Sequence, residues 1–288
     1  MVFQFNGSRG VYPGTPMGIM AKFRQLHKES ARRMKLEQMY EEGPSGMSRP
    51  PSDVVHTAFF PVIADAKPVY TYTKNALEVY RALTLRSELG LNMVLTGLSE
   101  GYDALDKVRA AGVPVAITMG LPDKPKWATD IKVDSLDQIL ASYTEESRTA
   151  TFRDVEAERR NLEAKQLISR RNYVEMPKQY AEAGISFAFA SYGVDTSDIA
   201  GNLKAMVDGG LGADVALAAL TVHAADVLGL SSSMGTVEVG KMANLVVTSG
   251  HLFAEDTNVR YVFVDGHKYE YESNSKTSDG PGSRRRGQ

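Results

Sequence analysis

The 288-residue sequence contains no cysteine and only five histidines. The absence of cysteine excludes disulfide bonds, thiolate nucleophiles, iron–sulfur clusters and thiolate zinc sites. The five histidines lie too far apart in the chain to form a local metal-binding motif. They are His27, His56, His223, His251 and His267. Neither a Gly-x-Ser-x-Gly elbow nor a phosphate-binding P-loop is present, so serine hydrolases and P-loop enzymes have no support from the sequence.

Net charge and long apolar runs are also scarce. The chain has 33 Lys and Arg against 35 Asp and Glu, and without an overall basic field we do not expect nucleic acid as a partner. No run approaches 18 apolar residues, so we expect no transmembrane helix and no membrane partner. Residues 1–10 lack a secretory pattern. We therefore predict a cytoplasmic location. The abrupt start of the chain suggests that an N-terminal part is missing, and we would expect export if that part carried a signal.

What the chain does contain is a regular alternation of strands and helices. Short β-branched or aromatic segments recur at intervals of roughly 20 residues and are separated by helical periodicity, which predicts βα units on a parallel sheet. The predicted strands of this part span residues 69–73, 93–96, 113–118 and 185–190. The predicted helices span residues 17–42, 76–89, 99–111, 152–183, 199–208 and 213–228.

The C-terminal region has a different pattern of short strands and turns. Strands are predicted over residues 235–239, 243–248, 259–264 and 267–271. The dipeptide Asp265-Gly266 between the last two favours a tight hairpin. Residues 273–288 are polar, and we expect a disordered tail whose three arginines are solvated.

Two runs near the C-terminus resemble a known family. Residues 218–230 read AALTVHAADVLGL, and residues 234–247 read MGTVEVGKMANLVV. Together with the VFVDG turn at 262–266, they resemble the closing segment of the amidohydrolase superfamily, in particular its imidazolonepropionase-like branch. The resemblance covers roughly residues 10–271.

The resemblance implies a (β/α)8 barrel with a small β-sandwich and the hydrolysis of carbon–nitrogen bonds, often in cyclic amides. In the family a divalent metal such as zinc activates the attacking water. We therefore predict an α/β fold, namely a partial TIM-type barrel made of the last four βα units, with a C-terminal β-sandwich segment. The predicted parts are an N-terminal loop and helix region (1–67), the partial barrel (68–230), the sandwich segment (231–272) and the disordered tail (273–288).

In this chain the residues at the family's metal-ligand positions differ from the family pattern. The family has His-x-His after the first strand, single histidines after the fifth and sixth, and an aspartate after the eighth. Here no His-x-His occurs, and the three positions that can be located read Thr-Tyr-Thr (71–73), Thr-Gly-Leu (96–98) and Ser-Tyr-Gly (191–193). Asp195 is the one nearby carboxylate, and one carboxylate does not hold a divalent ion. We expect no metal cofactor in this chain.

Two functional interpretations follow. The chain is either a metal-dependent hydrolase that retains activity, or a non-catalytic module that acts as a scaffold or binds a small molecule between Tyr72, Thr96, Thr118 and Tyr192. We expect His223 to make a structural polar contact. A half barrel also leaves two unpaired sheet edges, so we expect a homo-oligomer or a companion barrel half, unless the missing strands belong to an upstream segment.

Overall fold

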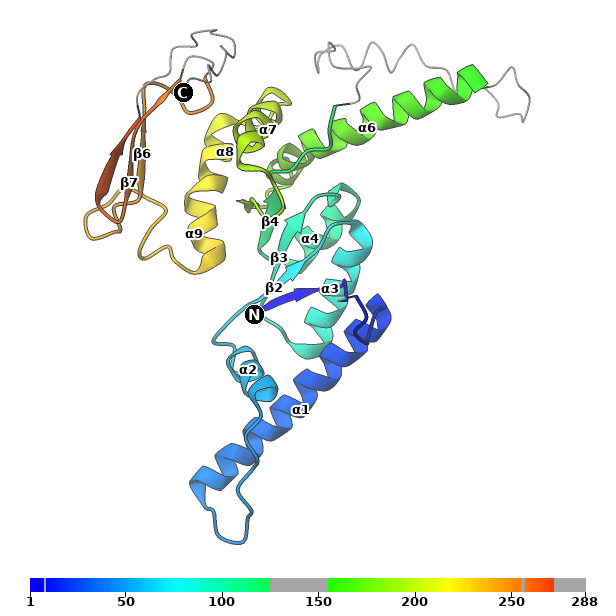
Figure 1. The fold of residues 1–288 in the computed structure, drawn as a ribbon, viewed down its shortest axis with the longest axis vertical. Coiled ribbons are helices and arrows are strands. Elements are labelled where there is room, and N and C mark those ends of the chain that lie inside the picture. The colour runs from blue at the N-terminus through cyan, green and yellow to red at the C-terminus, as the bar shows by residue number, and fades with distance from the viewer. Residues whose placement is uncertain (8, 125–154, 255–256, 272–288) are drawn as a thin grey trace, which may run out of the picture.

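The computed structural model describes the chain except for residues 8, 125–154, 255–256 and 272–288. Figure 1 shows a parallel sheet flanked by helices, with a small antiparallel sheet beyond α9 near the C-terminus. The predicted tail at 273–288 lies outside the described residues. No helix in the described part of the chain is long and apolar enough to cross a bilayer.

The parallel sheet has five strands, one more than the sequence predicts. The strands follow one another in chain order across the sheet, and every neighbouring pair is parallel. They are β1 (Val2–Gln4), β2 (Val69–Tyr72), β3 (Met93–Leu98), β4 (Val115–Thr118) and β5 (Phe187–Ala190). The additional strand, β1, lies in the region 1–67 that we describe from sequence as loop and helix. Three residues are too few to show alternation, and the strand depends on its pairing with β2.

The helices largely follow the predicted periodicity. They are α1 (Pro16–Glu42), α2 (Val54–Ile63), α3 (Ala76–Leu89), α4 (Leu105–Ala111), α6 (Val155–Glu182), α7 (Thr196–Asp208), α8 (Ala213–Leu220) and α9 (Val222–Leu228), with a 3-10 turn η1 (Tyr102–Ala104). Asn75 caps α3 by accepting a hydrogen bond from the Glu78 N–H at 3.1 Å. The helix predicted from residue 99 begins later, because Ser99 instead donates its hydroxyl to the Lys74 carbonyl at 2.9 Å. Helix α2 is not predicted from sequence.

The helix predicted over residues 213–228 is broken at Thr221, where φ is −120° and ψ is −84°. The Thr221 hydroxyl donates to the Leu217 carbonyl at 2.7 Å, which is a local bond that competes with regular helical pairing. Two contacts then hold α9 against the parallel sheet: the Tyr70 hydroxyl donates to the Val227 carbonyl at 3.2 Å, and His223 bonds the Phe187 carbonyl.

The antiparallel sheet contains β6 (Leu245–Thr248), β7 (Val259–Val264) and β8 (His267–Glu270). Asp265 and Gly266 have positive φ angles of 49° and 85°, as a tight hairpin between paired strands requires, so the predicted turn is confirmed. Residues 235–239 form turns and bends rather than the predicted strand. The three strands suit the predicted sandwich segment.

The core lies between the sheet and its helices, and an aromatic chain extends it to the N-terminal helices. The rings of Phe3 and Phe23 lie 4.5 Å apart, and those of Phe23 and Phe59 lie 5.7 Å apart. All three side chains are buried. Phe23 therefore joins β1, α1 and α2.

We predict that Phe23→Ala lowers the free energy of unfolding by about 3 kcal/mol or more, because it leaves a cavity at this junction. Urea unfolding of the whole chain measures the loss. The control is Met17→Ala in the same helix, where the side chain is 81% exposed and the expected change is within about 0.5 kcal/mol. Equal effects of the two substitutions would show that the aromatic chain does not anchor α1.

Candidate functional site

The four side chains predicted to line a binding site lie along the C-terminal edge of the parallel sheet. Tyr72 ends β2 and is in register with Thr96 of β3. Thr118 ends β4 and is in register with Ala190, the last residue of β5. Tyr192 follows two residues later. Parallel barrels place their chemistry at this edge, so the structure brings the four residues to the expected end of neighbouring strands.

Two of the four side chains are in direct contact. The rings of Tyr72 and Tyr192 lie 5.4 Å apart at an interplanar angle of 77°, which is the edge-to-face arrangement that aromatic quadrupoles favour. Tyr72 is half-buried, whereas Tyr192 is 73% exposed. The Lys74 Nζ atom lies 5.7 Å from the centre of the Tyr72 ring. The edge of the sheet therefore carries an aromatic pair with a cation beside it.

Gly97 determines where the Tyr72 ring lies. Its φ angle is +67°, which favours glycine, and the register of β3 with β4 shifts between Thr96 and Leu98. A Cβ atom added at Gly97 would lie 2.0 Å from Cε2 of Tyr72. The Tyr72 ring thus fills the space that a side chain at Gly97 would need, directly at the end of β3.

The other sequence candidates are less closely joined. Thr118 Oγ1 accepts a hydrogen bond from the Gly120 N–H at 3.1 Å, which leaves the hydroxyl hydrogen able to donate. Asp195 is exposed at the N-terminal cap position of α7, but its side chain does not cap the helix. Within the described residues, its carboxylate has no hydrogen-bonding or ionic partner.

Loops after β2 and β3 are tied together in a way that the sequence does not reveal. The Lys74 carbonyl accepts from the Glu100 N–H at 2.7 Å, and the Tyr173 hydroxyl of α6 donates to Glu100 Oε1 at 2.6 Å. Burial first, and then this bond to a carboxylate, raises the pKa of Tyr173 above its ordinary value. Glu100 and Tyr173 lie 73 residues apart, and no local pattern could join them.

The metal that the family resemblance implies finds no ligand set here. Across residues 1–124 and 155–271, apart from those whose placement is not described, no group of three or more His, Asp or Glu side chains is placed to hold a metal ion. Near the ends of β2 and β3, Tyr72 offers a phenol and Thr96 a hydroxyl, and Gly97 has no side chain. Neutral phenols and hydroxyls are poor ligands for zinc, so the described residues do not fit a divalent metal.

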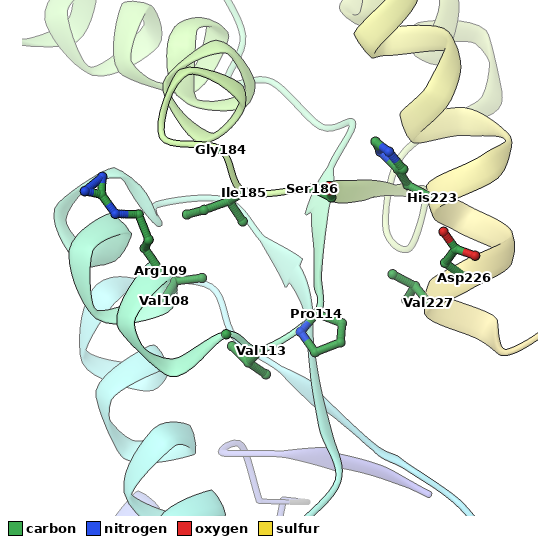
Figure 2. A pocket seen from close by; sticks show the side chains of 11 residues that line it. Val108, Arg109, Val113, Pro114, Gly184, Ile185, Ser186, His223, Asp226 and Val227 are labelled. Carbon is green, nitrogen blue, oxygen red and sulfur yellow. The ribbon is translucent and has the colours of Figure 1, made fainter.

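A cavity of about 360 Å³ lies at the opposite edge of the sheet, where β4 and β5 begin (Figure 2). Figure 2 shows Pro114 and Ile185 at this edge, with His223 and Asp226 projecting from α9 on the other side. His223 Nδ1 lies 3.1 Å from the Phe187 carbonyl oxygen, which is the structural polar contact that we expect from sequence. The carbonyl requires Nδ1 to donate, so the contact also fixes the ring orientation.

We predict that Gly97→Ala destabilises the fold more than Gly112→Ala, by at least about 1 kcal/mol, because only the first substitution forces a Cβ into the Tyr72 ring. Gly112 is the matched control, since it has a similar φ of +56° and no heavy atom within 4 Å of an added Cβ. Chemical denaturation measures both. The Tyr72→Ala background should remove the difference, and a difference that persists would contradict the close packing of Tyr72 on Gly97.

Comparison with solved structures finds amidohydrolases. An amidohydrolase from Thermotoga maritima MSB8 has a TM-score of 0.67 and 22% sequence identity, over 94% of this chain and 62% of that protein. A second amidohydrolase has a TM-score of 0.50 and 13% identity, over 94% and 68%. A prolidase complexed with N-methylphosphonate-L-proline has a TM-score of 0.49 and 16% identity, over the same shares. The TM-scores of the two amidohydrolases show a shared fold, and the chain spans less than two thirds of the Thermotoga protein.

Comparison with curated proteins gives no match. The sequence profile described as the amidohydrolase family matches residues 70–268, which is more than half of the chain and includes strands β2–β5, the Tyr72–Tyr192 pair and the antiparallel sheet. The chain therefore belongs to the amidohydrolase family.

Proposed function

We propose that this chain is a non-catalytic member of the amidohydrolase family that binds a small planar anion at the C-terminal edge of its sheet. The observation that carries the proposal is the Tyr72 ring, which fills the space beside Gly97 at the end of β3. An aromatic side chain there replaces the kind of polar ligand that a metal centre needs.

The family chemistry depends on several ligands that together hold one ion. A catalytic zinc site typically uses three protein side chains, and the ion lowers the pKa of its bound water. In the described residues the edge of the sheet offers Tyr72, Thr96, Thr118 and Tyr192, together with an isolated Asp195. We infer that the ancestral metal centre is lost from this part of the chain, and with it the hydrolysis of carbon–nitrogen bonds. The long runs at 218–230 and 234–247 support descent from the imidazolonepropionase-like branch.

The chemical class of the ligand follows from three kinds of group at this edge: the aromatic rings, the Lys74 ammonium and the threonine hydroxyls. Aromatic rings bind flat apolar groups through stacked or edge contacts, and Lys74 supplies a positive charge 5.7 Å from the Tyr72 ring centre. Hydroxyl groups of Thr96 and Thr118 lie along the same edge and are able to donate to an anionic oxygen. A small aromatic carboxylate combines the two properties, and benzoate is the simplest probe.

The open edges of the sheet support a further proposal about assembly. Within the described residues, β1 and β5 each pair on one side only, and unpaired backbone groups favour pairing with another chain or segment. We propose that a second copy, or a companion part of the barrel, pairs with these edges. Sedimentation of the protein as a compact monomer at high concentration would contradict pairing between copies.

We predict that the purified chain contains substoichiometric zinc, manganese and iron by elemental analysis. Adding any of these ions should leave the thermal midpoint unchanged, because an ion that binds the folded state would raise it. The same preparations should hydrolyse no cyclic amide. Stoichiometric metal, or amide hydrolysis that appears when metal is added, would support a retained hydrolase instead.

We predict that Tyr72→Ala weakens benzoate binding by about tenfold, because it removes the ring contact. Lys74→Gln should weaken benzoate about two- to fivefold, as expected for an exposed ion pair, and should leave benzamide unchanged. Titration followed by NMR measures both effects. The control is Tyr269→Ala. It alters a 53% exposed tyrosine of β8, which belongs to the antiparallel sheet and not to this edge. Equal binding by the wild type and Tyr72→Ala would place the ligand elsewhere.

A further inference from the structure

A second pocket lies in the N-terminal helical hairpin, defined here as α1, the connecting residues 43–53 and α2. Figure 1 shows α1 running away from the parallel sheet, the connection turning back at its far end, and the short α2 lying on the way back to the sheet. The pocket has a volume of about 440 Å³ and lies between α1, the connection and the first turn of α2. That volume is within the range of sites for small organic ligands.

The wall of this hairpin pocket is held by one arginine. Arg33 Nη2 donates to the Pro51 carbonyl at 2.7 Å, and Arg33 Nη1 lies 3.4 Å from Asp53 Oδ2. Asp53 Oδ1 in turn accepts from the Val55 N–H at 2.9 Å and caps α2. The charge of Arg33 is therefore already matched, and its bonds fix the connection against both helices.

The lining residue His56 contacts Ser30 and lies near Asp53, but the three residues do not form a nucleophilic site. Ser30 Oγ lies 2.8 Å from His56 Nδ1, and His56 Nε2 lies 4.0 Å from Asp53 Oδ2. Ser30 is completely buried, so its oxygen cannot reach a substrate. The separation of 4.0 Å also exceeds a hydrogen bond. The three residues join α1 to α2.

Two further arginines give the pocket its unmatched charge. Arg32 of α1 and Arg49 of the connection are exposed and line the pocket from different elements. In the part of the chain that the structure describes, neither has an ion-pair or hydrogen-bond partner. Glu29 is the one acidic lining residue, and its carboxylate accepts from Gln25 Nε2 at 2.9 Å. Because Asp53 already matches Arg33, the remaining charged lining residues are Arg32, Arg49 and Glu29, which together carry a net charge of +1.

Like charges that line one pocket repel each other, and a bound anion offsets that repulsion. A guanidinium donates two parallel hydrogen bonds to a phosphate, which makes arginine the preferred side chain for such groups. The same pocket has an apolar surface from Leu36, Met47 and Pro50. An anion with an apolar substituent satisfies both kinds of surface.

We propose that the hairpin pocket binds a phosphate monoester, with the phosphate between Arg32 and Arg49 and an apolar substituent against Leu36 and Met47. The site is separate from the sheet edge that carries Tyr72. It therefore holds or fails independently of the function proposed above.

The proposal is tested by calorimetric titration of the whole chain with phenyl phosphate. An ionic strength of about 0.15 M screens diffuse electrostatic attraction. We expect a Kd below about 1 mM, and at least about tenfold weaker binding by the double variant Arg32→Gln, Arg49→Gln. The control is Lys28→Gln, Lys35→Gln. It removes the same charge from exposed positions of α1 outside the lining, and its affinity should stay within about twofold of the wild type.

Inorganic phosphate separates the contributions of the anionic and the apolar parts of the ligand. Phosphate should bind more weakly than phenyl phosphate, because it lacks the apolar group. In the wild type, NMR signals from the Nε–H groups of Arg32 and Arg49 should shift on addition of phenyl phosphate, which locates the site even if a variant does not fold.

Absence of binding to the wild type would overturn the proposal, as would equal loss of affinity in the two double variants. Phenyl phosphate that leaves both arginine signals unshifted would also contradict it. Phosphate that binds as tightly as phenyl phosphate would overturn the apolar part of the site.

Discussion

The parallel pairing of β1 to β5 is the constraint on which the rest of the molecule depends. Each strand satisfies the backbone groups of its neighbour, and a connection must return to the same end of the sheet before the next strand can start. Helices such as α3 and α4 make those returns and cover the sheet with apolar side chains. Because all five strands point the same way, every strand end lies at one edge, and the residues that follow each strand become neighbours there.

The packing of Tyr72 against Gly97 gives this edge its character. The backbone of β3 turns through a positive φ at Gly97 and offers a flat, empty surface, and the half-buried Tyr72 ring lies on it. Tyr192 then meets the Tyr72 ring edge to face. This aromatic pair, with Lys74 beside it, is the basis of the proposed recognition of planar, charged molecules at these strand ends.

The hairpin pocket is formed by a different kind of interaction. At the sheet edge, polar and aromatic groups meet because the strands are in register, whereas in the hairpin the connection is held in place by Arg33, Asp53 and Pro51. Arg32 of α1 and Arg49 of the connection line the same pocket without acidic partners among the described residues. A connection held by side-chain contacts and two arginines without acidic partners in the described chain are the features on which the proposed phosphate site rests.

The sequence by itself determined the parallel α/β architecture, the hairpin turn at Asp265-Gly266 and the family. These features depend on local periodicity, on glycine conformation or on long contiguous motifs. Only the tertiary structure decided the strand character of β1, the break at Thr221, the contact between Tyr72 and Tyr192 and the pocket of the hairpin. Each of these depends on groups far apart in the chain: β1 forms because β2 offers free backbone groups, and the Tyr72 ring has its place because Gly97, 25 residues later, has no side chain.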